Sequence, residues 1–178
     1  AGAIYPEGVI AGFAALARAR GIALIIDETY RDFLGPGANR AHGLFTDAAW
    51  RDTVIQLYSF SKAYAVPGHR VGAITAGPAA LGQILKVLDS FQICPARTAQ
   101  EPLAWAIEGL ADWRAATRAT INARIGAFET VLRACPGWAI SSIGAYFAYV
   151  RHPFEGAQAE RVAEALATRR GVLGLPGS

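Results

Sequence analysis

The chain has 178 residues, of which 53% are hydrophobic and 17% are charged, and this balance is typical of a packed globular protein rather than a disordered one. Its formal net charge is +3, but the basic residues are spread along the chain and only Arg169 and Arg170 are adjacent, so no basic stripe predicts nucleic-acid binding. No apolar run approaches the roughly 18 residues that cross a membrane. We therefore expect neither nucleic acid nor a membrane as partner.

The sequence also carries indications of compartment and completeness. The cysteines, Cys94 and Cys135, lie far apart and match no metal-ligand or redox spacing. We therefore expect buried, reduced thiols, no metal site and a cytoplasmic protein. The chain contains no Met and begins in what resembles the middle of a loop, which is why we interpret it as a fragment.

Hydrophobic spacing predicts helices and strands in chain order. Apolar residues recur at helical spacing over 6–20. A continuous apolar run at 22–26 is typical of a strand buried on both faces of a parallel sheet, the segment at 54–58 repeats this theme, and 71–75 is a third candidate strand. The remaining pattern predicts helices at 78–89, 97–107, 110–134 and 160–170, a two-strand unit at 138–141 and 146–150, and a strand-like run at 172–175.

This order of elements predicts an α/β protein with a mostly parallel sheet and helices packed on it. We place a domain boundary near residue 110. Residues 1–109 are expected to form part of a large domain, and residues 110–178 a long linking helix followed by part of a smaller α+β domain.

The segment after the second predicted strand gathers residues that suit a phosphate-bearing ligand. Ser59, Ser61 and Lys62 follow the strand, and Arg70 lies a few residues further along. Short hydroxyl donors and a planar guanidinium match the needs of phosphate oxygens. Lysine is scarce here, since Lys86 is the only other one, and a lysine that loses water at a strand end can become an imine-forming nucleophile. On composition alone, a surface lysine in a polar loop is the more common case.

Two motifs together resemble those of the class I/II aminotransferases, which are fold-type I pyridoxal-phosphate enzymes. Ser-Phe-Ser-Lys at 59–62, followed by Gly-His-Arg-Val-Gly at 68–72, resembles the lysine signature of this family. Asp-Glu-Thr-Tyr at 27–30 is similar to the family's Asp-Glu-x-Tyr element, and the separation between the two elements also matches. The segments at 1–6 and 146–148 resemble, respectively, the end of the Asn-Pro-x-Gly loop and the strand that opens the small domain's sheet. The resemblance therefore covers nearly the whole chain.

The resemblance implies pyridoxal 5'-phosphate as cofactor and a catalytic role for three residues. Lys62 would bind the cofactor as an imine and then act as general base and acid. Asp27 would face the pyridine nitrogen and keep the ring protonated, so that the ring accepts electrons from the substrate. Tyr30 would donate a hydrogen bond to the phenolic oxygen of the ring. Without the rest of the pattern, Asp27 is equally well interpreted as a loop cap and Tyr30 as a packed core aromatic.

The resemblance also implies a set of phosphate ligands. Ser59 and Arg70 would bind the phosphate, and Ser61 is a further cofactor-binding candidate that could instead only shape the loop. We expect His69 to be structural or exposed, because a lone histidine usually has no chemical task.

The function implied by the resemblance is amino transfer between an amino acid and a 2-oxo acid, in a homodimer. A C–S lyase or decarboxylase on the same fold is a second interpretation, because the cofactor serves several bond cleavages. The aminotransferase-like effector domain of a transcription regulator is a third, and a folded fragment without activity is a fourth. The family's glycine-rich phosphate turn, ring-stacking aromatic and substrate-carboxylate arginine are not matched within the chain, so we expect these residues alone to be inactive.

Overall fold

The computed structural model describes residues 2–38 and 40–177, which fall into two compact units. The larger unit is Ile4–Asn122, and the smaller unit is Ala123–Ser178 together with Ala1–Ala3. The division falls inside the long helix α5 (Ala111–Arg133), whereas the predicted boundary lies at the start of that helix. The predicted segments at 1–6 and 110–178 each include one terminal residue outside the described range.

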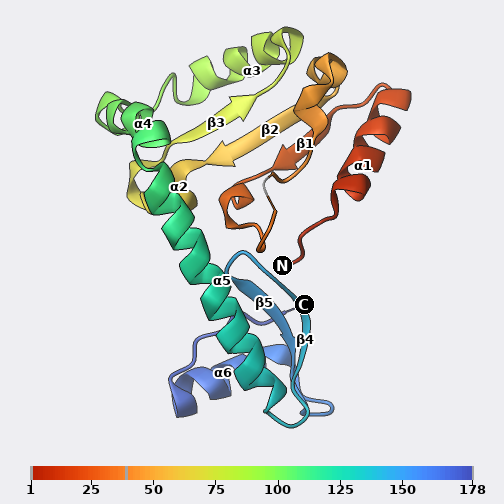
Figure 1. Cartoon of the computed structure of the whole chain (residues 1–178), viewed down its shortest axis with the longest axis vertical. Helices are drawn as coiled ribbons and strands as arrows, with labels where there is room; N and C mark the ends of the chain where they lie inside the picture. The colour runs from red at the N-terminus through yellow and green to blue at the C-terminus, as the bar shows by residue number, and fades with distance from the viewer. Residues whose placement is uncertain (1, 39, 178) are drawn as a thin grey trace. The chain divides into compact units, whose positions relative to one another are not determined.

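The larger unit is built on a three-stranded sheet with the order β1-β2-β3 (Figure 1). β1 (Leu24–Asp27) and β2 (Val54–Ser59) are parallel, whereas β3 (Gly72–Thr75) runs antiparallel to β2. The sheet is therefore mixed, with two parallel strands and one antiparallel strand. The chain turns back at the carboxyl end of β2 through residues 60–71 instead of crossing the sheet, and such a connection gives an antiparallel pair.

Helices and short 3-10 turns complete the larger unit. The predicted helices at 6–20, 78–89 and 97–107 are confirmed, with ends that differ by at most two residues. The shorter helical turns were not predicted, because segments this short show no periodic pattern of apolar residues. The helices are α1 (Glu7–Ala19), α2 (Phe60–Ala63), α3 (Pro78–Phe91) and α4 (Arg97–Gly109), and the 3-10 turns are η1 (Arg31–Phe33), η2 (Leu44–Thr46), η3 (Ala48–Asp52) and η4 (Pro67–His69).

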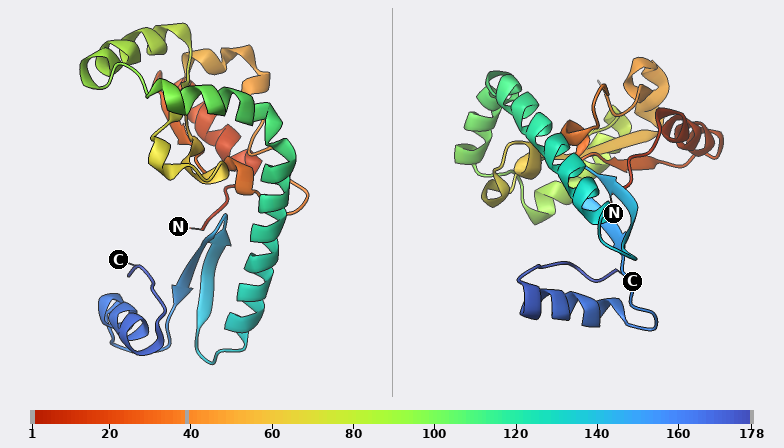
Figure 2. Two further views of the ribbon diagram at one scale, coloured as in Figure 1. Left: turned by 90° about the vertical axis from the view of Figure 1, so that its left-hand side faces the viewer. Right: turned by 60° about the horizontal axis from the view of Figure 1, so that its bottom comes forward.

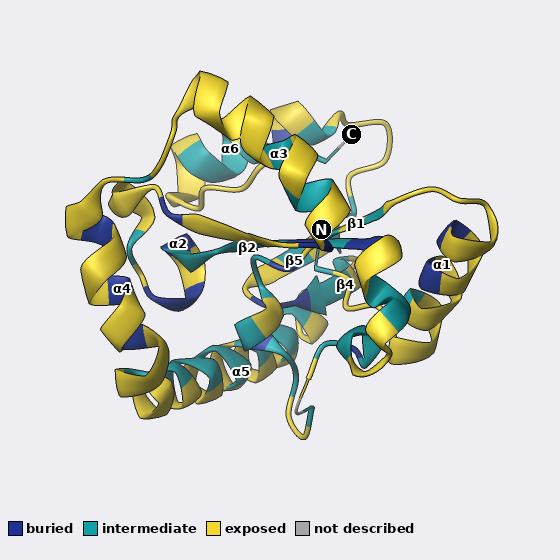
Figure 3. Ribbon diagram, turned by 90° about the horizontal axis from the view of Figure 1, so that it is seen from above, coloured by how far each residue is buried: buried dark blue, intermediate teal, exposed yellow. Residues whose placement is uncertain are grey.

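Burial alternates along β1 and along the first half of β2, whereas β3 is exposed throughout. Val54 and Gln56 are buried in β2, whereas Ile25 of β1 is 62% exposed. Because neighbouring strand residues face opposite sides, one face of the sheet contributes to the core and the other face is open in this chain. The prediction of strands buried on both faces is therefore wrong. Figure 3 shows buried residues on β2, on α2 and on one stripe each of α1 and α4.

The smaller unit contains the predicted pair of strands, which are antiparallel (Figure 2). Its strands are β4 (Ala139–Gly144) and β5 (Phe147–Arg151), and helix α6 (Ala159–Arg170) follows them. α6 ends at Gly171, whose left-handed backbone (φ 65) is typical of a helix C-terminus. Residues 172–175 form no strand, so that prediction is wrong; an apolar run needs a partner strand before it can form a ladder.

Two further expectations can be compared with the described residues. Both cysteines are free, but Cys94 is exposed and Cys135 is only partly covered, so their predicted burial is wrong. Across residues 2–38 and 40–177, no helix combines the length and the apolar content that a membrane span requires.

Candidate active site

The carboxyl ends of β1 and β2 and the amino end of β3 meet at one edge of the sheet in the larger unit. Asp27 ends β1 and pairs with Leu57, while Ser59 ends β2 and pairs with Gly72 at the start of β3. Because Leu57 and Ser59 are two residues apart, Asp27 and Ser59 lie on the same face of the sheet. The residues predicted to form the site all lie at this edge or in the turns that leave it: Asp27, Tyr30, Ser59, Ser61, Lys62 and Arg70.

Lys62 lies in α2, the single helical turn that follows β2. Ser59 caps this turn, because its Oγ accepts a hydrogen bond of 3.3 Å from the Ser61 N–H. Ser61 is buried, whereas Lys62 is exposed. The turn therefore fixes the backbone beneath the lysine, but the predicted loss of water around its side chain is not observed in this chain.

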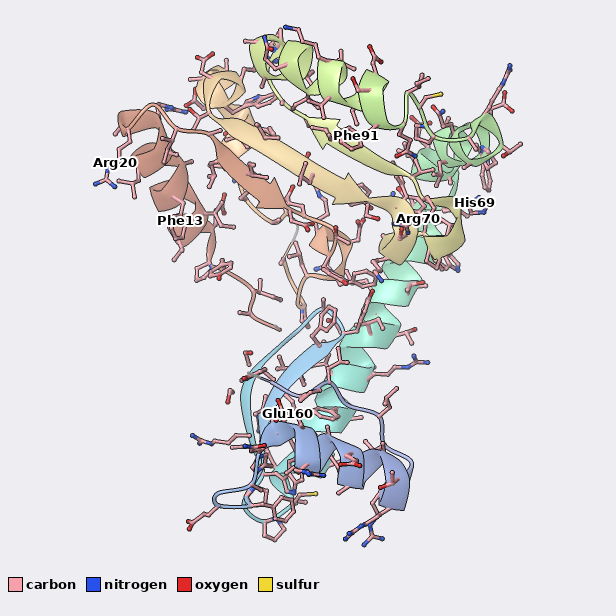
Figure 4. All side chains as sticks on the ribbon, turned by 180° about the vertical axis from the view of Figure 1, so that it is seen from behind. Phe13, Arg20, His69, Arg70, Phe91 and Glu160 are labelled. Carbon is pink, nitrogen blue, oxygen red and sulfur yellow. The ribbon has the colours of Figure 1, made fainter. Side chains whose placement is uncertain are left out.

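Arg70 reaches the same edge from the other end of the connection between β2 and β3 (Figure 4). The Phe60 N–H donates to the Val71 carbonyl at 3.2 Å and so closes the loop. Arg70 has a left-handed backbone (φ 54, ψ 46), and its Nη1 donates to the Pro67 carbonyl at 2.9 Å. The guanidinium is exposed, and His69 is exposed as predicted.

The turn after β1 holds the Asp27 carboxylate. The N–H and the hydroxyl of Thr29 donate to Asp27 Oδ1 at 3.0 and 2.7 Å, which is the arrangement of an Asx turn. The Glu28 N–H donates to the Leu57 carbonyl at 2.8 Å and extends the pairing past the strand end. Asp27 is exposed and Tyr30 is half-buried. The carboxylate is thus oriented by its own turn and remains accessible.

Sequence analysis missed a buried polar cluster behind this edge, which we call the Glu28 cluster: Glu28, His42 and Gln56. Gln56 Nε2 donates to Glu28 Oε2, and His42 Nε2 lies 3.0 Å from Glu28 Oε1 without an ideally aligned hydrogen bond. Glu28 comes just after the apolar run at 22–26, and Gln56 interrupts the apolar segment at 54–58. A polar residue in such a place is a signal of a buried hydrogen-bond network.

A second cluster, the Asp32 cluster, consists of Asp32, Tyr58 and Arg114. Asp32 accepts a hydrogen bond of 2.7 Å from the Tyr58 hydroxyl and one of 2.9 Å from Arg114 Nη1. Burial, followed by the Asp32 carboxylate, raises the pKa of Tyr58 far above its ordinary value. The Arg114 guanidinium also lies 5.1 Å from the centre of the Tyr64 ring, within the range of a cation–π contact. No local pattern in the sequence marks this pairing of residues 82 positions apart.

Solved structures of aminotransferases have the same fold. An aromatic aminotransferase from Pyrococcus horikoshii OT3 superposes with a TM-score of 0.87 and 22% identity over 99% of this chain and 48% of that one. The N-succinyldiaminopimelate aminotransferase of Mycobacterium tuberculosis gives a TM-score of 0.84 and 25% identity over 98% of this chain and 46% of that one. This chain therefore spans about half the length of these structures.

Curated relatives point the same way. The aromatic aminotransferase ISS1 of Arabidopsis thaliana is 28% identical over 115 residues, which cover 63% of this chain and 28% of that protein. An aspartate aminotransferase of Sulfurisphaera tokodaii is 29% identical over 80 residues, which cover 45% of this chain and 20% of that protein. The family model for aminotransferase class I and II matches residues 1–178. The chain therefore belongs to the class I and II aminotransferase family.

Proposed function

We propose that the whole protein is a pyridoxal-phosphate-dependent aminotransferase that transfers an amino group between an amino acid and a 2-oxo acid. Family membership supports this proposal. The single observation that carries it is the position of Asp27, Ser59, Lys62 and Arg70 at one edge of one sheet. Since the chain spans about half the length of the solved relatives, the activity is proposed for the whole protein.

The donor set at this edge suits pyridoxal 5'-phosphate. Lys62 offers an amine that would hold the cofactor at its aldehyde carbon, and Asp27 offers a carboxylate that would face the pyridine nitrogen. Hydroxyl and guanidinium donors for the phosphate are present in Ser59 and Arg70. Asp27, Lys62 and Arg70 are exposed, so each side chain is accessible to a ligand. When bound, the cofactor supplies an electron sink for the substrate's reacting carbon.

Each residue then has one task. Lys62 Nζ would hold the cofactor and would take and return the proton of the substrate carbon. The Asp27 carboxylate would keep a proton on the pyridine nitrogen, and the Tyr30 hydroxyl would donate to the phenolic oxygen. Ser59 and Arg70 would hold the phosphate. Ser61, which is buried, supports the Ser59 side chain through the N–H that it donates to Ser59 Oγ.

Because Lys62 is exposed in this chain, the bound cofactor has to supply the shielding from water that the lysine needs. A lysine needs a drier surrounding to react as a neutral amine near neutral pH. In the whole protein, we expect the bound cofactor ring to shield Lys62 from bulk water. Asp27 shares a face of the sheet with Ser59, so a ring placed between carboxylate and phosphate ligands would cover this edge.

The experiment is done on the whole protein and compares Lys62 with Lys86, the only other lysine of this chain. With pyridoxal 5'-phosphate added, the wild-type protein should show a visible absorbance band, and Lys62→Ala should lose both this band and amino transfer. Lys86→Ala is the matched control, because Lys86 is exposed on α3 and donates to Gln83. A Lys62→Ala protein that keeps the band would remove Lys62 from the site. Release of carbon dioxide or of a thiol in place of a 2-oxo acid would favour the decarboxylase or lyase alternative.

The assembly and the compartment form part of the same proposal. We propose a cytoplasmic homodimer, as resemblance to the family implies, and the free thiols of Cys94 and Cys135 suit a reducing compartment. A monomeric whole protein in light scattering would contradict the dimer.

A further inference from the structure

The Glu28 cluster lies directly behind the Asp27 carboxylate. Neighbouring residues of a strand point to opposite faces of the sheet, and Glu28 is 6% exposed while Asp27 is exposed. His42 and Gln56 are 7% and 5% exposed. Polar side chains this deeply buried are costly unless they satisfy one another. The cluster is therefore a defined interaction site inside the larger unit, separate from the ligand-facing residues.

The contacts fix the protonation pattern of the cluster. The Leu44 N–H donates to His42 Nδ1 at 3.2 Å, so Nδ1 carries no proton and a neutral ring carries its proton on Nε2. His42 Nε2 faces Glu28 Oε1 at 3.0 Å, while Gln56 Nε2 donates to Oε2. Both oxygens of the buried carboxylate thus face N–H groups.

The cluster also connects the two ends of the turn that carries Asp27 and Tyr30. Arg31 directly follows this turn, and its N–H donates to the Glu28 carbonyl at 3.0 Å. Its guanidinium Nη1 lies 3.4 Å from Glu28 Oε2. Through Gln56 the same carboxylate is attached to β2, the strand that leads to Lys62. A displacement of Glu28 would therefore shift Asp27 relative to the lysine.

We propose that Glu28 is a positioning residue that orients Asp27 from the buried face of the sheet, through its contacts with His42 and Gln56. The inference rests on the proposed function, because it takes Asp27 to face the pyridine nitrogen. Replacing a whole buried network of charged and polar side chains by well-packed apolar residues is often neutral or stabilising. Stability alone therefore does not account for Glu28, whereas the orientation of its exposed neighbour does.

The test uses Glu28→Gln in the whole protein. This change keeps the shape but places an NH2 group against the N–H of His42 or Gln56, so one contact of the cluster becomes repulsive. The dissociation constant of the apo protein for pyridoxal 5'-phosphate should rise about tenfold, which is the scale of one lost hydrogen bond to a charged group. Without cofactor, the Thr29 amide, which donates to Asp27, should exchange faster with solvent.

Val54→Ala is the control, because Val54 is buried at the opposite end of β2. This variant should lower the melting temperature and leave both the cofactor affinity and the Thr29 exchange rate unchanged.

The outcomes separate the inference from the proposed function. If the wild-type protein does not bind pyridoxal 5'-phosphate, the proposed function fails, and the Thr29 exchange rate still decides whether Glu28 orients Asp27. If the wild type binds the cofactor but Glu28→Gln leaves affinity and exchange unchanged, or if Val54→Ala changes them equally, the inference is overturned.

A second pair of variants covers the case in which Glu28→Gln does not fold. His42→Gln retains an N–H donor that can reach Glu28, whereas His42→Leu removes the donor at similar volume. We expect cofactor affinity near the wild-type value for His42→Gln and a loss of about tenfold for His42→Leu. Equal affinities in the two variants would contradict the positioning role.

Discussion

Two carboxylates bracket the turn that presents Asp27 and Tyr30, and both are bonded to the same strand. Glu28 lies directly after Asp27 and is bonded to Gln56, whereas Asp32 lies two residues after Tyr30 and is bonded to Tyr58. Gln56 and Tyr58 are two residues apart on β2, so they point to the same face of the sheet. The turn is thus attached to β2 on both sides.

The two attachments differ in how the charge of the carboxylate is balanced. Glu28 is deeply buried: Gln56 donates to its Oε2, His42 Nε2 lies 3.0 Å from its Oε1, and the Arg31 guanidinium, which is 40% exposed, lies 3.4 Å from Oε2. Asp32 is paired instead with the Arg114 guanidinium at 2.9 Å, and these side chains are 18% and 24% exposed. Arg114 belongs to α5, so the second attachment holds a helix against the sheet edge by a close ion pair, whereas the first combines uncharged donors on Gln56 and His42 with a longer contact to Arg31. Variants of Arg114, Gly72 and Tyr58 test how much the Asp32 attachment contributes to the free energy of unfolding.

Removing the cation of the Asp32 cluster should have the largest effect. Arg114→Met leaves a mostly buried Asp32 carboxylate without its ion-pair partner, which should lower the free energy of unfolding by about 2–3 kcal/mol, somewhat below the loss for a fully buried pair. Arg97→Met is the control, because the Arg97–Glu101 pair of 2.7 Å is largely exposed and should contribute less than about 1 kcal/mol. Chemical denaturation measures both. Similar losses in the two variants would show that the Asp32 pair acts as an ordinary surface pair.

Sequence analysis located this edge but not the two clusters behind it. Apolar runs and the residues that end them placed Asp27 and Ser59 at strand ends, since a polar residue after an apolar run is a local signal. His42 and Arg114 carry no such signal, because their partners lie far away along the chain. Their roles emerge only from tertiary contacts.

Two further properties of the sheet could not be predicted correctly from the sequence. The direction of β3 depends on whether the chain crosses the sheet or turns back, and a run of apolar residues at 71–75 is compatible with both. Burial of both faces was inferred from continuous apolar sequence, yet Ile25 is exposed because this chain covers one face only. Apolar sequence therefore predicted the strands, but not their direction or what covers them.

Crowding at the start of β3 should have the next largest effect on the Asp32 cluster. A Cβ at Gly72 would lie 2.8 Å from the Tyr58 carbonyl oxygen, so β2 and β3 must move apart in Gly72→Ala. The expected loss is about 1–3 kcal/mol, as for other overpacked sites. Gly82→Ala is the matched control, because a Cβ there meets nothing within 4 Å and the residue lies inside α3. It should stabilise the protein by about 0.5–1 kcal/mol. Losses in both variants would point to a general effect of alanine rather than to crowding at β2.

Removing one hydrogen bond from the Asp32 cluster should have the smallest effect. Tyr58→Phe loses the donor at 2.7 Å from Asp32 but keeps the ring and the Arg114 pair. We expect a loss of about 1 kcal/mol in the free energy of unfolding at neutral pH. Tyr5→Phe is the control, since Tyr5 is exposed. A loss in Tyr58→Phe as large as that in Arg114→Met would mean that the ion pair adds nothing to the hydrogen bond.

The pH dependence of stability in Tyr58→Phe tests whether Asp32 keeps the Tyr58 hydroxyl protonated. The pKa of Tyr58 is raised above its ordinary value of 10.0, first by burial and then by Asp32, so the folded protein keeps a phenol proton that the unfolded chain releases. The contribution is fully present below pH 10, and the free energy of unfolding falls as the pH rises above this value. In Tyr58→Phe this fall should be shallower, with the remainder due to Tyr64, whose pKa is raised by burial. Denaturation curves of both proteins across this alkaline range test the point, and equal slopes would mean that Asp32 does not hold the Tyr58 proton.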